Sequence, residues 1–346
     1  MSAGKPVFAS QVVAWQKLHG RHDLPWQNTR DPYRVWLSEV MLQQTQVATV
    51  IDYFERFVTR FPDVRALAAA QLDEVMGLWS GLGYYSRARN LHRCACAVVE
   101  NWGGAFPVRA EELVTLPGIG RSTAAAIASL CFGERVAIMD ANVRRVLARY
   151  LAFDGDLAQQ ANQNLLWEQA HSLLPSARLA QTMPSYTQGM MDLGATVCLP
   201  RQPLCGACPV QANCAGLQRG SPQDFPVRSR KLRRSARSVW LLMARNRADA
   251  VWLQRRPVPG VWAGLYCLPW FDSREALVEQ VPTPYRTALQ DVGGFKHVLT
   301  HMDLHLHPVL VELPADVAAS PVGQWFGADQ WPHLGLPAPV RVLLQA

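Results

Sequence analysis

Leu116-Pro117-Gly118-Ile119-Gly120 lies between two segments whose apolar residues recur at helical spacing, one ending near Val114 and one beginning at Arg121. Glycines at positions 118 and 120 permit positive φ and remove side chains from the turn. Backbone N–H groups and the positive end of the following helix can then face an anion. The stretch therefore predicts two helices joined by a tight turn that binds phosphate.

This turn, within about residues 108–131, looks like a helix-hairpin-helix, a motif whose contacts hold DNA without reading its sequence. A simple corner between two helices is the alternative. Helical spacing continues on both sides, from about residue 8 to 215, as in Val50, Phe54 and Phe57. We therefore expect residues 1–225 to form an all-α domain.

Length, charge and hydropathy limit the remaining possibilities. A chain of 346 residues exceeds what one hydrophobic core normally supports, so two domains are expected. The formal net charge of +7 favours a polyanionic partner such as nucleic acid, although charge alone is a weak signal. The sequence has no basic segment followed by an apolar leader and no apolar run of membrane-spanning length. We expect a monomeric, cytoplasmic protein with reduced thiols and no membrane association.

Cys198, Cys205, Cys208 and Cys214 fall at C-x6-C-x2-C-x5-C, a spacing that lets one loop aim four thiolates at a single inorganic centre. Zinc sites usually pair two short knuckles, whereas only Cys205 and Cys208 form a knuckle here, which favours an iron–sulfur cubane. Zinc, disulfides and unrelated buried cysteines are the alternatives, and the lack of a secretory leader disfavours disulfides.

The second part of the chain changes character. Residues 226–237 are rich in arginine and lack apolar periodicity, which indicates an exposed basic linker that can lie along phosphates. Beyond it, the runs Ser238 to Met243, Val251 to Gln254 and Val298 to Val311 favour strands over helices. We expect residues 238–346 to form an α+β domain.

The hairpin turn, an aspartate twenty residues after Gly120 and the cysteine loop 198–214 together resemble the endonuclease III superfamily of DNA glycosylases. Further runs are similar to its MutY family of adenine DNA glycosylases: Trp36-Leu-Ser-Glu-Val-Met-Leu-Gln-Gln-Thr-Gln46, Gly81-Leu-Gly-Tyr-Tyr-Ser-Arg-Ala-Arg-Asn90, and Met139-Asp140 followed by Asn142-Val143. The similarity covers essentially the whole chain. It implies a multidomain protein, with an all-α helix-hairpin-helix glycosylase domain that carries one [4Fe-4S] cluster and a C-terminal Nudix-like domain.

The resemblance also implies excision of adenine mispaired with 8-oxoguanine or guanine from double-stranded DNA. That reaction needs a proton for the departing base and negative charge near the oxocarbenium-like sugar. Glu39 lies among apolar residues that favour the protonated acid, so it is the candidate donor to adenine N7. Asp140 precedes the helical run Ala141 to Leu151, where cap donors and the helix dipole favour the ionised form. It is expected to stabilise the sugar cation or to bond to it. Taken alone, Glu39 would be an ordinary helix-face carboxylate and Asp140 an ordinary cap.

Glycosylases that also cut the backbone carry a lysine eighteen residues before the aspartate, and its amine attacks C1′. Ser122 stands at that position, and a hydroxyl cannot form an imine, so strong lyase activity is not expected. Ser122 is a candidate for placing water or steadying the sugar. A plain serine at a helix N-terminus is the alternative.

A target base inside a duplex must be extruded, and the gap must be filled. By resemblance, Gln44 and Tyr84 insert around the lesion, and Gln43, Thr45 and Leu82 lie close to the 8-oxoguanine strand. Alternatively, Thr45 caps a helix that starts at Gln46, and Tyr84 belongs to the core. The remaining expected contacts are Gly118, Gly120, Asn142, Arg87, Arg89, Arg144 and Arg145 with DNA, and Leu24, Trp26 and Gln188 with adenine.

The C-terminal domain lacks the acids of an active Nudix hydrolase, whose motif is G-x5-E-x7-R-E-x2-E-E-x-G. Aligning on Gly260 keeps Arg274, Glu275 and Glu279, but two acids and the final glycine are missing, so too few oxygen ligands remain for magnesium. Recognition of 8-oxoguanine without hydrolysis is therefore expected.

The family's loop that contacts 8-oxoguanine reads Phe-Ser-His, and the matching segment here is Leu299-Thr300-His301. Thr300 keeps a hydroxyl and His301 keeps the ring, whereas the aromatic residue at position 299 is lost. Two rival functions remain beside a monofunctional adenine glycosylase. One is a bifunctional pyrimidine glycosylase and lyase, which Ser122 opposes, and the other is a non-catalytic damage-binding protein, which the Glu39 and Asp140 pair opposes.

Overall fold

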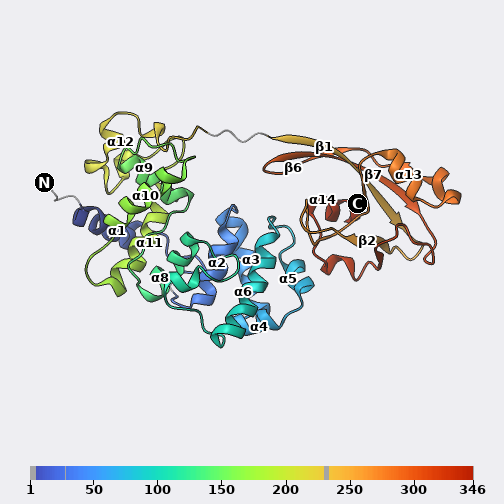
Figure 1. Cartoon of the computed structure of the whole chain (residues 1–346), viewed down its shortest axis with the longest axis horizontal. Helices are drawn as coiled ribbons and strands as arrows, with labels where there is room; N and C mark the ends of the chain where they lie inside the picture. Colours follow the sequence, from blue (N-terminus) through green and yellow to red (C-terminus); the bar gives the residue numbers. More distant parts are fainter. Residues whose placement is uncertain (1–4, 28, 230–233, 346) are drawn as a thin grey trace. The chain divides into compact units, whose positions relative to one another are not determined.

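Helices dominate the first part of the chain. The computed structural model describes residues 5–27, 29–229 and 234–345 (Figure 1). Its helices in this part are α1 (Lys5–His19), α2 (Pro32–Leu42), α3 (Val47–Arg60), α4 (Val64–Ala69), α5 (Leu72–Leu78), α6 (Ser86–Trp102), α7 (Ala110–Leu113), α8 (Arg121–Phe132), α9 (Ala141–Tyr150), α10 (Gln160–Ser172), α11 (Leu179–Thr196) and α12 (Ala215–Gln218). The predicted all-α character of this part is confirmed.

The chain divides into two compact units, Met1–Ala68 with Arg93–Arg230, and Ala69–His92 with Lys231–Ala346. The second unit thus combines the helical segment around α5 with the strand-rich C-terminal part. Residues 230–233 of the expected basic linker lie outside the described residues. Within the part of the chain that the structure describes, no helix combines the length and the apolar character that crossing a bilayer requires.

Apolar and small side chains hold the helices of the first unit together. On α3, Val50, Phe54 and Phe57 recur on one face and are fully buried. Helix α8 buries mainly alanines, and such small side chains allow neighbouring helices to approach closely. Helices α2 and α11 both pack against α8. This packing brings α2, which carries Glu39, close to α11, which carries Gln188.

The predicted hairpin turn joins α7 to α8. Gly118 has a φ of 77°, a left-handed conformation that glycine adopts without steric cost. The prediction of positive φ for Gly120 is wrong, because Gly120 is the N-cap of α8 with a φ of −85° and a ψ of 168°. A Cβ built at Gly120 would meet no described atom within 4 Å, so the N-terminus of α8 is open to solvent there.

The C-terminal part of the second unit is an eight-stranded sheet. Its strands are β1 (Ser235–Arg245), β2 (Val251–Arg255), β3 (Tyr266–Cys267), β4 (Trp270–Phe271), β5 (Gln290–Asp291), β6 (Phe295–Val298), β7 (Met302–Glu312) and β8 (Gln324–Phe326). The main order is β3-β2-β1-β7-β5. Strands β1 and β7 pair in parallel, from Ser235 opposite Met302 to Arg245 opposite Glu312. The predicted strands are confirmed, except that residues 299–301 form a turn between β6 and β7.

Two helices cover the sheet on opposite faces (Figure 1). Side chains of β1 alternate between the faces, as strand geometry requires. Val239 and Leu241 pack in one core with Val340 of α14 (Ala338–Gln345). Leu242 packs in the other core with Leu277 of α13 (Arg274–Gln280). The predicted α+β class of this part is therefore confirmed.

The helical segment 69–92 of the second unit contacts the backbone of the strand-rich part. The Tyr85 hydroxyl donates to the carbonyl of Leu336 at 2.8 Å, and the Arg89 guanidinium donates to the carbonyl of Ala263 at 2.5 Å. Ser80 Oγ accepts a hydrogen bond from Arg341 at 3.0 Å. These contacts fix the turn that carries Tyr84 within its own unit.

Candidate active site

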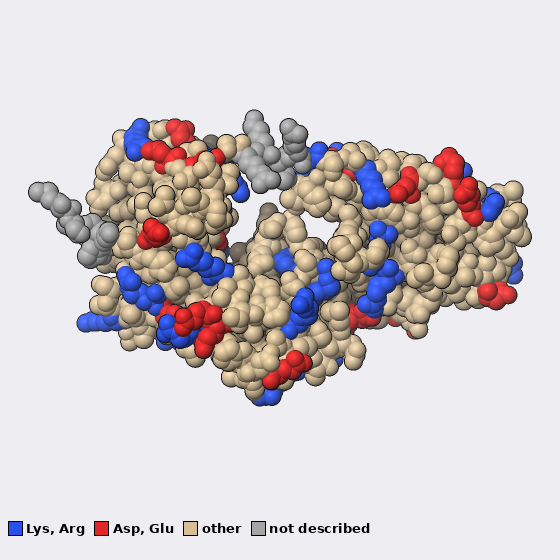
Figure 2. Space-filling model, in the orientation of Figure 1, with Lys and Arg blue, Asp and Glu red and all other residues tan. Residues whose placement is uncertain are grey.

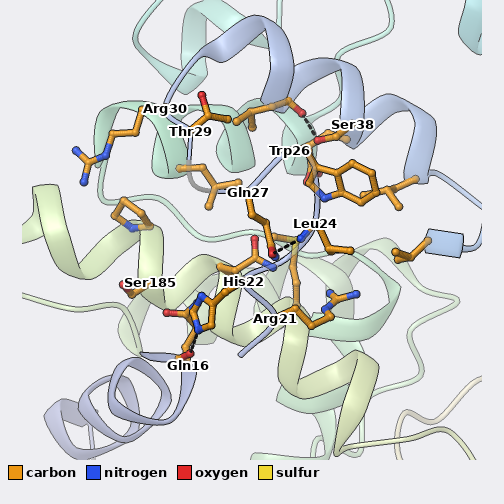
Figure 3. A pocket seen from close by; sticks show the side chains of 18 of the residues that line it. Gln16, Arg21, His22, Leu24, Trp26, Gln27, Thr29, Arg30, Ser38 and Ser185 are labelled. Atoms are coloured by element: carbon orange, nitrogen blue, oxygen red, sulfur yellow. Dashed lines mark hydrogen bonds between the residues drawn. The ribbon is translucent and has the colours of Figure 1, made fainter. Parts of the chain in front are cut away.

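A hollow of about 530 Å³ opens in the first unit among the segment after α1, helix α2 and helix α11. The three predicted adenine-pocket residues, Leu24, Trp26 and Gln188, line it together with Glu39. Figure 3 shows Leu24 and Trp26 on the segment that leads into α2, around the same hollow as Ser185 of α11. The volume is typical of small-ligand sites and suits a nucleobase.

The wall formed by Trp26 is rigid. Trp26 is buried, and its ring meets the Phe54 ring of α3 edge-to-face with the centroids 5.4 Å apart. The Arg34 guanidinium also lies over the Phe54 ring, 5.5 Å from its centroid. An aromatic face held in this way can stack on a flat ligand without first being ordered.

Glu39 lies in the middle of α2. The helix starts with Asp31 as N-cap, whose side chain accepts from the backbone N–H of Tyr33, and with Pro32 in its first turn. Burial, together with the negative charge of Asp140, raises the pKa of Glu39 from 4.5 to about 7. A carboxylic acid that keeps its proton near neutrality can serve as a general acid.

Asp140 is the N-cap of α9, as predicted, and its Oδ1 accepts from the backbone N–H of Val143 at 2.6 Å. Burial raises the pKa of this carboxyl above its ordinary value, while the backbone donors of Val143 and Asn142 and the charges of Arg145 and Arg144 oppose the rise. The expected preference of the cap for the ionised form is present, but burial outweighs it. Asp140 is therefore a partly desolvated carboxyl group, and it lies near enough to Glu39 for its charge to raise the pKa of Glu39.

Ser122 and Asn142 both make internal hydrogen bonds. Ser122 Oγ accepts from the backbone N–H of Met139 at 3.0 Å, which ties the start of α8 to the residue before Asp140. Asn142 Oδ1 accepts from Arg145 at 3.0 Å. Both side chains therefore help to hold the Asp140 turn, whatever contact they make with DNA.

Sequence reasoning missed most of the polar residues at the pocket, including two cations and a buried acid near it. Lys17 and Arg21, at and after the end of α1, line it. Asp192 lies behind it on α11, is fully buried, and forms a salt bridge of 2.7 Å with Arg21. The spacing of Gln188 and Asp192, four residues apart on one predicted helix, was the available signal.

The segment Gln43-Gln44-Thr45 turns the chain from α2 into α3. Gln44 is exposed and has a φ of 58°, a left-handed conformation that is unusual for a residue other than glycine and frequent at functional sites. Thr45 is not the cap of α3, because Gln46 occupies that position and makes no side-chain cap bond. The turn presents the Gln44 side chain to solvent.

Tyr84 lies on a comparable turn in the second unit. Its φ is 48°, and 43% of the residue is exposed, so it is not a core residue. Its hydroxyl lies 2.5 Å from Thr300 Oγ1, and both side chains line a hollow of about 510 Å³ together with Trp262, His297 and His301. The structure thus brings together Tyr84, Thr300 and His301, each of which was predicted from the sequence to contact DNA at the lesion.

Several expected DNA contacts have other roles. Leu82 is 5% exposed and Arg87 is 7% exposed, and Arg87 donates to the carbonyls of Leu82 and Gly83. Burial lowers the pKa of Arg87 to about 10. These two residues support the Tyr84 turn from inside, and their predicted contacts with DNA stay predictions.

Two further arginines that sequence reasoning had assigned to phosphate are used within the protein. Arg145 donates to the carbonyls of Cys198 at 2.7 Å and Gly194 at 2.6 Å, and Arg89 to that of Ala263. Arg144 is half-buried, and burial lowers its pKa. On the face seen in Figure 2, Lys and Arg side chains are scattered among acidic ones and form no single continuous patch.

The four cysteines of the loop line one cavity beside α9. All four are unpaired thiols, so the disulfide alternative is not realised. Burial, together with the nearby thiols of the other three cysteines, raises the pKa of Cys208 to about 11. Arg149 donates to Cys198 Sγ at 3.4 Å and can offset thiolate charge. This donor set fits an iron–sulfur cluster.

The described residues contain no group of three or more His, Cys, Asp or Glu side chains arranged to hold a single metal ion. In the Nudix-like part, the acidic residues that the motif alignment keeps lie on the surface. There Arg274 pairs with Asp291 at 2.9 Å, while Glu275 and Glu279 are exposed on α13.

Comparison with known proteins yields the same order of domains. Residues 37–170 match the family model for HhH-GPD superfamily base excision DNA repair proteins, and residues 239–346 match a NUDIX domain model. The adenine DNA glycosylase of Buchnera aphidicola subsp. Acyrthosiphon pisum (strain APS) is 34% identical over 99% of this chain and 97% of its own length. The adenine DNA glycosylase of Homo sapiens is 35% identical over 94% of this chain and 71% of its own. A solved structure of a thermostable thymine-DNA glycosylase matches with a TM-score of 0.55 and 29% identity, covering 62% of this chain and 97% of that chain.

Proposed function

This chain belongs to the adenine DNA glycosylases, within the HhH-GPD superfamily of base excision DNA repair proteins, and from that premise we propose how its own residues release the base. Its substrate is DNA, and its reaction is the hydrolysis of an N-glycosidic bond. The observation that carries the proposal is a single pocket of nucleobase size whose wall includes an acid with a pKa raised to about 7.

Glu39 is the general acid. Adenine, extruded from the duplex, enters the pocket between the Trp26 face and α11, and Glu39 gives its proton to N7. The protonated base leaves with the bonding electrons of the N-glycosidic bond, and the sugar becomes an oxocarbenium ion. The Asp140 carboxylate stabilises that cation or bonds to C1′ until water adds there. Ser122 and Asn142 hold the Asp140 turn in place.

The mispair is A opposite 8-oxoguanine, with A opposite guanine as the poorer substrate. Tyr84, Thr300 and His301 support this assignment because they meet at one hollow in the second unit. Gln44 and Tyr84, each exposed on a left-handed turn, fill the gap that the extruded nucleotides leave. Gly118 and the open N-terminus of α8 at Gly120 bind backbone phosphate.

One [4Fe-4S] cluster is held by Cys198, Cys205, Cys208 and Cys214. When bound, the cluster supplies iron–thiolate bonds that fix the loop from residue 198 to 214. The test is chemical analysis of iron and sulfide with a visible absorbance spectrum. Cys208→Ser should lose the absorbance and the iron, whereas Cys96→Ser, outside the loop, should keep both. Iron retained in Cys208→Ser would contradict this ligand set.

The decisive experiment on the reaction is single-turnover release of adenine from a duplex with one A:8-oxoguanine pair. Wild-type protein should release free adenine and leave an intact abasic strand. Glu39→Gln should lower the rate by at least about 100-fold while keeping DNA affinity, because an amide cannot donate the proton. Glu55→Gln, an exposed site on α3, is the matched control and should keep full activity.

Borohydride in the same assay tests for an imine. Lys17 lines the pocket, so its amine is the group to exclude. No covalent adduct is expected, since the position of the lyase lysine is Ser122. A trapped adduct that disappears in Lys17→Ala would overturn the monofunctional assignment.

A further inference from the structure

Asp192 is a buried anion with an unusually complete set of partners. It lies on α11 with no exposed surface. Arg21 donates two hydrogen bonds to it, from its backbone N–H at 3.1 Å and from its guanidinium Nε at 2.7 Å, and its Nη2 forms an ion pair with Asp192 Oδ1 at 2.7 Å. A buried carboxylate is stable only when paired and hydrogen-bonded, and this one is. Asp192 does not line the pocket itself, so its influence on a ligand must pass through a neighbour.

That neighbour is Gln188, one helical turn earlier. Gln188 Nε2 donates to Asp192 Oδ1 at 2.9 Å. A carboxamide has one donor end and one acceptor end, whereas a carboxylate only accepts, so the amide must turn its nitrogen toward Asp192. Its oxygen is then the end that remains for a ligand. Because Gln188 lines the same pocket as Glu39, a base in the pocket meets a fixed acceptor there.

Resting on the proposed function, we propose that Asp192, anchored by Arg21, positions Gln188 so that the pocket selects a 6-aminopurine. Adenine carries an N–H donor at C6, next to the N7 that Glu39 protonates. Gln188 Oε1 accepts from that amine. Hypoxanthine and guanine carry a carbonyl oxygen at C6, which would face Oε1 with no proton between them. A buried acceptor left unpaired disfavours such bases strongly.

The test is a reciprocal exchange read as a ratio of rates. Single-turnover release is measured from duplexes with deoxyadenosine or deoxyinosine opposite 8-oxoguanine. An asparagine at position 192 can donate as well as accept, so in Asp192→Asn the Gln188 amide can rotate and point its nitrogen into the pocket. The ratio of the adenine release rate to the hypoxanthine release rate should then fall by about ten-fold or more. Gln188→Glu should also lower adenine release, because two carboxylates then face each other without a donor. The double variant D192N/Q188E restores a donor–acceptor pair and should recover much of the ratio.

Thr187→Val is the matched control. Thr187 precedes Gln188 on α11, and its substitution removes a buried hydrogen bond with Ser129 of α8. The variant should therefore lower stability and leave the ratio unchanged. Thermal unfolding of each variant identifies loss of folding, and if Asp192→Asn does not fold, Gln188→Glu decides. An unchanged ratio in Asp192→Asn together with unchanged adenine release in Gln188→Glu, or no recovery in the double variant, overturns the inference while adenine release by wild type still supports the proposed function. If wild type releases no adenine, the proposed function fails instead.

Discussion

A carboxyl group keeps its proton at neutral pH only where its surroundings resist its charge, and Glu39 meets that condition. Burial and the nearby Asp140 charge raise its pKa to about 7. The protonated form is the active one, so adenine release should be fastest below pH 7 and should fall as pH rises through 7 toward 9. Single-turnover rates across that range measure this. A rate that rises over the same interval would mean that Glu39 acts as a base.

The raised pKa of Glu39 also makes the free energy of unfolding depend on pH. The folded-state pKa of Glu39 lies above its ordinary value of 4.5, so the folded protein binds more protons than the unfolded chain between pH 4.5 and 7. Stability should therefore decrease as pH rises through this interval. Glu39→Gln removes the charge and should stabilise the protein by roughly 1–3 kcal/mol at pH 8 but not at pH 4. Urea unfolding at the two pH values tests this, with Glu55→Gln as the unaffected control.

At the scale of elements, the two glycines of the hairpin before α8 should contribute differently to protein stability but alike to DNA binding. Gly118 has a φ of 77°, so Gly118→Ala should cost about 1–2 kcal/mol of stability. Gly120 has an ordinary φ and open space around it, so Gly120→Ala should cost less than about 1 kcal/mol. Both variants should weaken DNA binding, because the added methyl group lies where a phosphate approaches. Thermal unfolding and binding to an abasic duplex measure the two effects. Unimpaired binding by Gly120→Ala would place the phosphate elsewhere.

Features that depend on residues close together in the sequence could be predicted from it. The cap at Asp140 depends on the next three residues, and the helix that carries Glu39 depends on its own apolar spacing and on Asp31. The salt bridge between Arg21 and Asp192 could not be predicted, because its partners are 171 residues apart and only the packed helices bring them together. The burial of Arg87 could not be predicted for a related reason. An arginine in a polar run predicts a solvent-exposed charge, and only tertiary structure shows that it is buried.

At the scale of the whole molecule, the proposed excision pocket and the proposed lesion-recognition hollow lie in different compact units. The Glu39 pocket belongs to the first unit, and Tyr84 and Thr300 belong to the second. Neither unit's site shares a residue with the other. A substitution at the lesion site should therefore change which mispair is preferred without changing the chemistry at Glu39.

Thr300→Val tests this separation. It keeps the shape of the side chain but removes the hydroxyl that lies 2.5 Å from the Tyr84 hydroxyl. We expect the rate on A:8-oxoguanine to fall about five-fold or more, as loss of one hydrogen bond allows, and the rate on A:G to stay unchanged. Tyr84→Phe removes the other hydroxyl and should have a similar effect if the pair acts as one unit. Single-turnover rates on both duplexes measure the preference. An equal loss of rate on A:8-oxoguanine and A:G would contradict this role. It would show that Thr300 supports DNA binding in general, because a contact with the oxidised base affects only the A:8-oxoguanine substrate.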